Sequence, residues 1–362
     1  MSDSRSPSQL RWSFAICVSL GCGSVGASAV AVKQVQVADG VYQFITAPDG
    51  YVPNGNSVVV VSQSDVLVFD TFTRPSTARN ELAAIRRITD KPVRFVVNSH
   101  WHPDHWSGNE IYARTFPNLE IIATEETRQL MLNTANAWPG SFAQDLRKDQ
   151  AALDLEIRTG KQSDGTALST AKRRSDVEDM RLEREFIEEA MQVVRTYPTL
   201  TYTDQLVIRH GGREFRFISV VGDARGTTVL YLPKEKILIT GDVLSYPIPY
   251  FTPPLSQHAR TLRQLASFDA TTIIPGHGPA WHDKDYLNLE ADLFETIVSQ
   301  VGAALRGGAV TVEEARKAVN VVSLRARFTH DDPDLNKQFD SYLQGMIENA
   351  YREARDGQVF TY

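Results

Sequence analysis

The sequence predicts an α/β (α+β) fold in which two β-sheets pack face to face and helices cover their outer faces. Runs rich in Val, Ile and Phe fill residues 41–123, and similar runs return over 205–275. A charged helical segment separates them, at about 125–197, and helical spacing resumes from 286. Two strand-rich halves around a helical insertion favour a core formed between two sheets, with helices outside.

The first half alternates short apolar runs with turn residues. One helix is expected at 79–88, because Leu82, Ile85 and Ile88 fall on one face and Lys91-Pro92 ends the pattern. The strand-like runs are bounded by Gly, Pro, Asn and Asp. The expected strands are 41–46, 57–62, 66–69, 95–98 and 119–123.

The insertion at about 125–197 has almost no strand signal. Its apolar residues form two weak helical stripes, made of Leu146, Leu153 and Ile157, and of Val177, Met180, Ile187, Met191 and Val194. The stretch 159–174 is rich in Gly, Ser, Thr and Lys and is expected to link two helices. The segment therefore predicts a helical hairpin; an independent linker domain is disfavoured by the low apolar content.

The second half reads as an antiparallel meander followed by helices. Short turns such as Gly211-Gly212 connect its strand-like runs, which lie at 205–209, 214–221, 227–232 and 236–240, with a last strand at 271–275. Helices are expected at 286–305, 311–319 and 335–351 within a C-terminal extension of about 286–362.

Composition excludes some classes of partner. The chain has 362 residues, 42% of them hydrophobic, which suits one large domain or two medium ones. The formal net charge of −6 gives no sign of a nucleic-acid surface, and no apolar run is long enough for a stable membrane span. A small-molecule substrate is the expected partner. The sequence carries no signal for an oligomeric state.

Residues 1–29 resemble a secretory signal peptide. Arg5 and Arg11 form a basic start, residues 12–20 are mostly apolar, and Ala27-Ser28-Ala29 is a small-x-small cleavage site. Cleavage after Ala29 would leave a mature chain of residues 30–362, expected to form one domain, in the periplasm or outside the cell. Cys17 and Cys22 both lie in the leader, so the mature chain would have neither disulfides nor thiolate ligands.

The densest chemical signal is His100-Trp-His-Pro-Asp-His105, which follows a strand-like run. Three of the chain's 8 histidines fall within these six positions. Alternating spacing sends His100 and His102 the same way, so they can share one ion, and Asp104 and His105 can turn toward a second. Imidazole and carboxylate ligands suit zinc, iron or manganese.

Two later strands end at further candidate ligands. Gly241-Asp242 puts a carboxylate at a strand tip, and Pro275-Gly-His277-Gly does the same with an imidazole. With the first loop and in this order, the segments resemble the metallo-β-lactamase superfamily over roughly residues 40–285. The family pattern is His-x-His-x-Asp-His, a later His, then Gly-Asp and Gly-His.

This resemblance implies an αββα sandwich with two divalent ions at one edge, most simply zinc, with iron or manganese as alternatives. By analogy His100 and His102 would hold the first ion. Asp104, His105 and His277 would hold the second, and Asp242 would bridge both. The helical insertion and the C-terminal helices lie outside the shared pattern.

One position departs from the family. Its middle histidine sits in a Gly-His-Thr-x-Gly turn, and the equivalent turn here is Gly222-Asp223-Ala-Arg225-Gly226. Three interpretations are open. Asp223 replaces the imidazole as a ligand, the site holds a single ion, or Asp223 pairs with Arg225 in a structural turn.

The implied chemistry is hydrolysis by a metal-bound hydroxide, with Asp104 and Asp242 as catalytic residues. A bond of the amide or ester type is expected, with β-lactams or lactones favoured. A thioesterase of the glyoxalase II type and a phosphodiesterase are the alternatives, and a catalytically degenerate binding protein is the alternative outside enzymes. The expected pocket residues are Trp101, Trp106, Arg225, Tyr246 and Tyr250.

Overall fold

The first sheet is assembled from strands of the first half in sequence order. The computed structural model describes residues 32–46, 54–134, 137–250 and 254–357. β1 to β4 pair antiparallel, and β4 to β7 pair parallel. The strands are β1 (Val32–Ala38), β2 (Val41–Thr46), β3 (Ser57–Val61), β4 (Val66–Phe69), β5 (Val93–Val97), β6 (Glu120–Thr124) and β7 (Leu200–Tyr202).

The second sheet confirms the expected meander. Its order is β12-β11-β10-β9-β8, antiparallel except that β12 lies parallel to β11. The helix α6 (Leu255–Ala266), which the sequence reading missed, makes the crossover between them. The strands are β8 (Gln205–His210), β9 (Arg213–Val220), β10 (Thr227–Leu232), β11 (Ile237–Gly241) and β12 (Thr272–Pro275).

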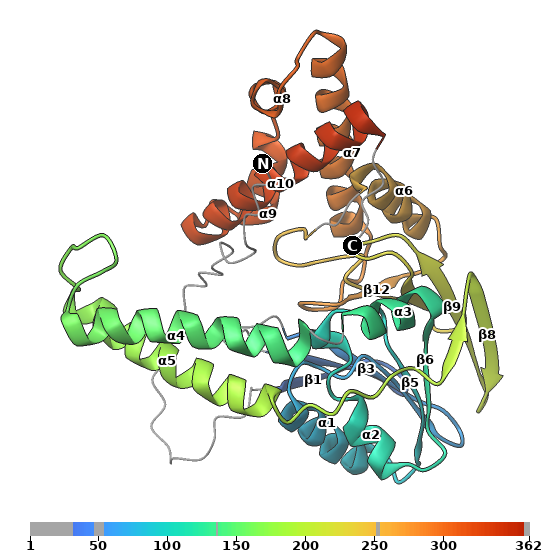
Figure 1. Ribbon diagram of the computed structural model, residues 1–362. Helices are drawn as coiled ribbons and strands as arrows, with labels where there is room; N and C mark the ends of the chain where they lie inside the picture. The colour runs from blue at the N-terminus through green and yellow to red at the C-terminus, as the bar shows by residue number, and fades with distance from the viewer. Residues whose placement is uncertain (1–31, 47–53, 135–136, 251–253, 358–362) are drawn as a thin grey trace.

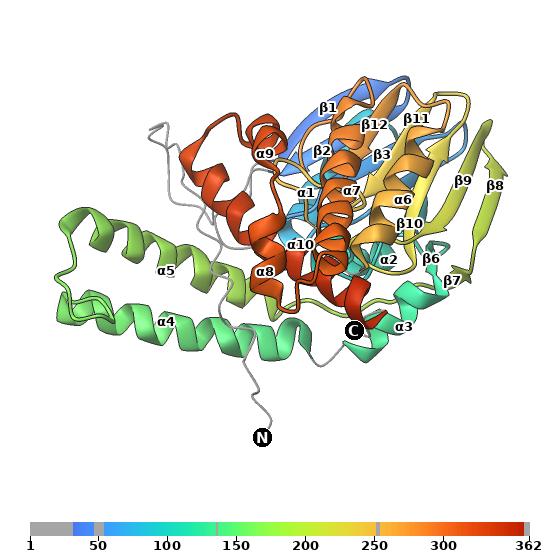
Figure 2. The ribbon, with the colours of Figure 1, turned by 90° about the horizontal axis from the view of Figure 1, so that it is seen from above.

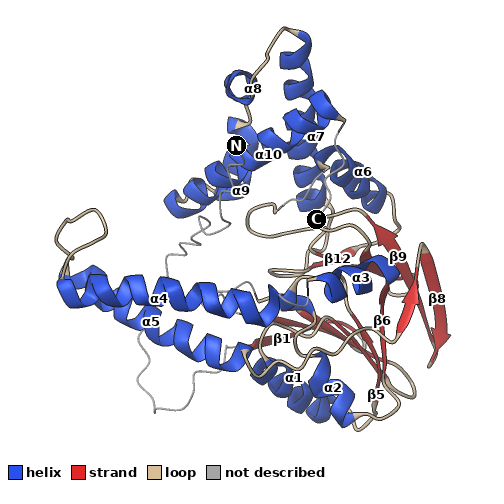
Figure 3. Ribbon diagram, viewed as in Figure 1, coloured by secondary structure: helices blue, strands red, loops and turns tan. Residues whose placement is uncertain are grey.

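Alternating side chains divide each sheet between two apolar layers. Val58 and Val60 of β3 face the second sheet, where they meet residues such as Phe217, whereas Val59 packs under α1 (Pro75–Ile88) and α2 (Asn109–Thr115). Leu230 likewise faces the first sheet. The neighbouring residues of β10 pack against α6, α7 (Asp285–Arg306) and α10 (Pro333–Asp356). The layers are therefore αββα, with α1 and α2 on one side and α6 and α7 on the other (Figures 1 and 3).

The insertion lies between the neighbouring strands β6 and β7. It begins with α3 (Glu125–Asn133) and a short helical turn (Ala137–Ser141), and continues as the hairpin of α4 (Phe142–Thr159) and α5 (Thr170–Ala190). The hairpin projects from the body as an arm in both views (Figures 1 and 2). Its second stripe was partly wrong: Ile187 is buried, but Val177 in the outer half of α5 and Met191 and Val194 just after the end of α5 are exposed.

The helices that follow α7 pack against α6 and α7. The three helices expected after residue 286 correspond to α7, α8 (Val312–Ala318) and α10, and α9 (Val322–Thr329) is an additional one. Among the residues that the structure describes, no helix is long and apolar enough to cross a membrane. The expected leader, with Cys17 and Cys22, lies outside the described residues.

Candidate metal centre

The His-rich loop begins where β5 ends, at the edge where the loops of both sheets meet. β5 is parallel to β4 and β6, so the carboxyl ends of these strands lie together. Asn98 and Ser99 lead into His100, and a short 3-10 turn runs from Pro103 to His105. The turn directs Asp104 and His105 into the interior, where both are buried.

Asp70, which the sequence reading missed, orients this loop from the end of β4. Its carboxylate accepts hydrogen bonds from Ser99 N at 2.7 Å, Ser99 Oγ at 2.8 Å and His105 Nδ1 at 2.8 Å. His105 Nδ1 is therefore the protonated nitrogen, and Nε2 points the other way. Asp70 follows a buried strand just as Asp242 does, and this was the signal that could have found it.

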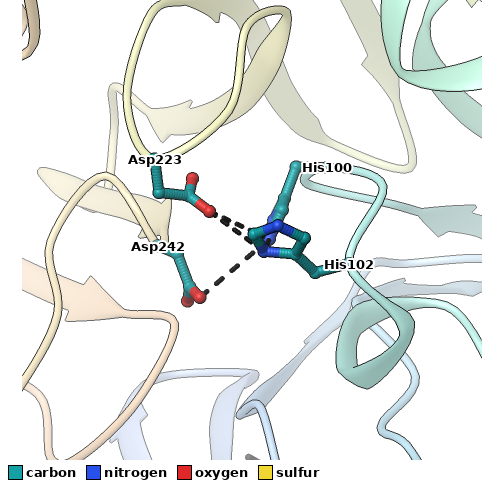
Figure 4. Close-up of side chains that lie close together, drawn as sticks. All are labelled: His100, His102, Asp223 and Asp242. Atoms are coloured by element: carbon teal, nitrogen blue, oxygen red, sulfur yellow. Dashed lines mark hydrogen bonds and ion pairs between the residues drawn. The ribbon is translucent and has the colours of Figure 1, made fainter. Parts of the chain in front are cut away.

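The structure brings all seven predicted ligand residues into two adjoining groups. His100, His102, Asp223 and Asp242 form the first group, and Asp104, His105, Asp242 and His277 form the second. Within each group the ligand atoms lie within 4.8 Å of one another. Asp242 belongs to both. Figure 4 shows the first group, with the two histidines from the β5 loop facing carboxylates from the second sheet.

The spacing of the ligand atoms fits ions of zinc size. A tetrahedral ion with bonds of about 2.0 Å separates its ligand atoms by about 3.3 Å. Asp223 Oδ2 lies 3.2 Å from both His100 Nε2 and His102 Nδ1. Asp104 Oδ2 lies 3.3 Å from His105 Nε2 and His277 Nε2, and Asp242 Oδ2 lies 3.4 and 3.2 Å from the same two atoms.

Two further observations agree with a cation site. Asp104 Oδ2, His105 Nε2 and Asp242 Oδ1 are buried without a hydrogen-bond partner, which is costly unless an ion or water satisfies them. Gly276 is required beside Asp242, because a Cβ atom there would lie 1.9 Å from Asp242 Oδ1. The donor set of imidazoles and carboxylates therefore fits a pair of divalent ions.

The carboxylates and imidazoles shift one another's pKa in opposite directions. Burial lowers the pKa of His277, but Asp242 and Asp104 outweigh it and raise the pKa to about 10. Burial raises the pKa of Asp242, but His277 and His105 hold it well below its ordinary range. His100 differs, because burial dominates and lowers its pKa to about 3. Without ions, protons on His277 and its neighbours thus balance the negative charge.

The two tryptophans of the loop have different environments. Trp101 is half-buried, and its ring lies edge-on to His102 at 4.6 Å between centroids, so it borders the first group. Trp106 was expected to line the pocket, but it is buried with Met131, Trp138, Phe186 and Ala190. These five residues form what is called below the Trp106 cluster, which packs the arm against the loop. The Trp106 expectation was wrong for this reason.

The other expected pocket residues lie on two sides of the site. Arg225 pairs with Glu126 of α3, its Nε 3.3 Å from Oε1. The ring of Tyr246 packs edge-on against Trp281 and Tyr286. Tyr250 contacts Tyr342 of α10. Burial, and then Asp223, Asp242 and Asp104, raise the pKa of Tyr250 to about 12, which places its hydroxyl in the field of the site carboxylates.

Comparison with known proteins agrees with the sequence and the geometry. The family model described as the metallo-beta-lactamase superfamily matches residues 50–277, more than half of the chain. The chain belongs to the metallo-beta-lactamase superfamily. Membership of this superfamily agrees with the αββα layers of the structure.

Proteins similar to this chain include an alkylsulfatase by sequence, and a sec-alkylsulfatase and a metallo-beta-lactamase by fold. A linear primary-alkylsulfatase from Pseudomonas sp. is 27% identical over 236 residues, which are 61% of this chain and 40% of the relative. The chain thus spans less than half of that relative's length. The solved stereoselective inverting sec-alkylsulfatase from Pseudomonas sp. aligns with a TM-score of 0.57 and 16% identity over 91% of this chain and 52% of its own. A metallo-beta-lactamase from Pontibacter korlensis aligns with a TM-score of 0.52 and 16% identity, over 73% and 99%.

Proposed function

We propose that the protein is a dinuclear metallohydrolase that cleaves an ester-type bond in a small molecule. The observation that carries this is the shared position of Asp242, whose carboxylate belongs to both ligand groups. Two divalent ions, most simply zinc, fit the donor set, with iron and manganese as alternatives. When bound, such ions polarise the substrate and lower the pKa of water.

The protein's own groups then divide the remaining work. Asp242 holds the two halves of the site together, since it lies 3.2 Å from His277 and 4.0 Å from His100. The Asp104 carboxylate can accept a proton from the attacking water and return it to the leaving group. The side chains of His102 and His277 are 23% and 22% exposed, so substrate can reach both ligand groups.

A primary alkyl sulfate is the first substrate class to test. The alkylsulfatase relative supports it, as does the solved sec-alkylsulfatase, whose alignment extends over more of this chain than that of the Pontibacter lactamase. The aromatic residues Trp101 and Tyr250 would contact the alkyl chain beside the ions. Arg225, two residues from Asp223, would meet the sulfate group only after its side chain leaves Glu126.

β-Lactams and lactones form the second class. The Pontibacter lactamase supports it, because the alignment covers almost all of that protein. Export through the leader at 1–29 would also favour β-lactams, which are met outside the cytoplasm. Thioesters and phosphodiesters are the remaining classes that a site of this kind can hydrolyse.

One assay distinguishes these classes. The purified protein, stripped with a chelator and reloaded with Zn²⁺ or Mn²⁺, is incubated with octyl sulfate, a chromogenic cephalosporin, a lactone, a thioester and a phosphodiester. Release of inorganic sulfate is the expected result. It should be lost in His277→Ala and retained in His210→Ala, a histidine that pairs with Asp65 outside the site.

The metal content decides between an enzyme and a binding protein. Elemental analysis should find about two ions per chain. Fewer than about one ion together with no turnover of any substrate would show a catalytically degenerate protein instead. Turnover of the cephalosporin or the lactone without release of sulfate would instead identify β-lactams or lactones as the substrate class.

We also propose that the mature protein is periplasmic or secreted. The support is the leader at residues 1–29, which the described residues do not include. Sequencing the N-terminus of protein from an exported fraction should find Val30 as its first residue. Recovery of intact Met1 from the cytoplasm would contradict this location.

A further inference from the structure

The segment Val243–Pro247, which follows Asp242, receives hydrogen bonds from two helices of the outer layer. His258 Nε2 of α6 lies 2.9 Å from Val243 O. The Tyr286 hydroxyl of α7 lies 2.9 Å from Ser245 O and 3.0 Å from Pro247 O, so its single proton is shared between these two carbonyl groups. The carbonyl groups of Val243, Ser245 and Pro247 thus accept hydrogen bonds from side chains of α6 and α7.

The contacts of His258 with Val243 and of Tyr286 with Ser245 are buried, and the contact of Tyr286 with Pro247 is partly buried. His258 and Val243 are completely buried and Tyr286 is nearly so. A carbonyl group can only accept, so His258 Nε2 carries the proton in its bond to Val243. Because solvent cannot replace a lost donor here, each donor restricts the position of the backbone that it holds.

The segment is joined to Asp242 by a tight turn. Gly241 has a φ of 54°, and its carbonyl accepts from Leu244 N at 3.4 Å and from Gly276 N at 2.8 Å. Ser245 Oγ donates to Asp242 O at 3.4 Å. The segment thus contacts the backbone of Asp242, whose carboxylate lies 3.4 Å from His105 and 3.2 Å from His277.

We infer that His258 and Tyr286 are positioning residues for Asp242. They hold the segment Val243–Pro247 so that the Asp242 carboxylate faces both groups of ligands. The inference rests on the proposed function, since it takes Asp242 as a ligand shared by two ions. It gives the outer helices α6 and α7 a role in metal affinity, although neither contributes a ligand.

The first test removes one oxygen atom. Tyr286→Phe keeps the ring but loses the donor to Ser245 and Pro247. Tyr351→Phe is the matched control, because Tyr351 is also buried and its hydroxyl donates to Val310 O at 2.6 Å, outside the site. Zn²⁺ affinity is measured by competition with a chromophoric chelator. Tyr286→Phe should bind Zn²⁺ about tenfold more weakly, as for other groups that orient ligands, and Tyr351→Phe should match the wild type.

The second test is rescue at His258. His258→Gln retains an N–H donor near Val243 O, whereas His258→Leu has none, so only the leucine variant should lose affinity. Equal Zn²⁺ affinity in wild type, Tyr286→Phe and Tyr351→Phe would overturn the inference, even if His258→Leu failed to fold. If the wild type bound none of Zn²⁺, Mn²⁺ and Fe²⁺, the proposed function would be overturned instead.

Discussion

At the residue scale, Asp223 is the position where this chain departs from its family. Its carboxylate lies 3.2 Å from His100 and His102, while Arg225 pairs with Glu126. This geometry favours the ligand interpretation among the three that the sequence left open. Sequence spacing could align Asp223 with the family's histidine. It could not show the carboxylate's neighbours, because these come from a loop more than a hundred residues earlier.

Asp223→Asn tests that interpretation. The amide keeps the size of the side chain but loses the charge, so the first ligand group should bind its ion at least about tenfold more weakly. Elemental analysis after dialysis should fall from about two ions per chain toward one. Asp269→Asn, an exposed aspartate paired with Lys236, is the control and should keep both ions. If Asp223→Asn still contained about two ions per chain after dialysis, Asp223 would be a structural residue and not a ligand.

Glu81 allows a test of stability against pH away from the ligands. Burial raises the pKa of Glu81 to about 8, although the hydrogen bond from the Tyr112 hydroxyl lowers it. The folded state therefore keeps a proton that the unfolded chain releases above pH 4.5. The protonated Glu81 carboxyl therefore contributes to the stability of the fold below pH 4.5, and this contribution is lost as pH rises through 8.

We expect the stability of the wild type to fall relative to Glu81→Gln between these pH values, by up to about 1.4 kcal/mol per pH unit. Urea denaturation of both proteins in chelator at several pH values measures the difference, and titration of the metal ligands cancels between them. Parallel pH curves for the two proteins would show that Glu81 does not titrate in this range.

At the element scale, the sequence predicted those helices and strands whose own residues carry a full hydrophobic pattern. The strands β2 and β4 have the expected bounds, because alternating or continuous apolar runs between turn residues define them. β7 and α9 were missed, since three or eight residues carry too little periodicity. The buried face of α5 was only partly identified, because the surface that covers Phe186 comes from other segments.

Phe186 should connect the arm to the body of the molecule. Its ring is completely buried in the Trp106 cluster, and the Arg74 guanidinium lies 4.8 Å from the ring centroid. Phe186→Ala should cost about 3–5 kcal/mol in the free energy of unfolding. Leu155→Ala should change the free energy of unfolding by less than about 0.5 kcal/mol, because Leu155 of α4 is 55% exposed. Equal effects of the two variants in urea denaturation would mean that the arm is not packed as the structure has it.

At the scale of the whole molecule, the site lies across the junction of the two sheets. His100 to His105 come from the first half, and Asp223, Asp242 and His277 come from the second. The order of the motifs was enough to predict that they meet. Their distances, the support from Asp70 and the contacts of His258 depend on how the layers pack, which no local pattern records.

This placement makes the stability of the whole chain depend on metal and pH together. Ions held by residues of both halves bind only the folded state, so a free ion concentration of 100 times Kd should add about 2.7 kcal/mol. Without ions, the pKa of His277 is about 10, raised above its ordinary value of 6.5. The protonated imidazole therefore stabilises the metal-free fold below pH 6.5, and this contribution is lost as pH rises through 10. An ion must displace that proton, so metal binding should strengthen as pH rises.

Thermal unfolding with Zn²⁺ and with chelator should thus show a larger difference in Tm at pH 8 than at pH 6. In His277→Ala that difference should shrink at both pH values and lose most of its pH dependence. A Tm difference that is independent of pH in the wild type would mean that the histidines of the second group do not release protons to the incoming ion.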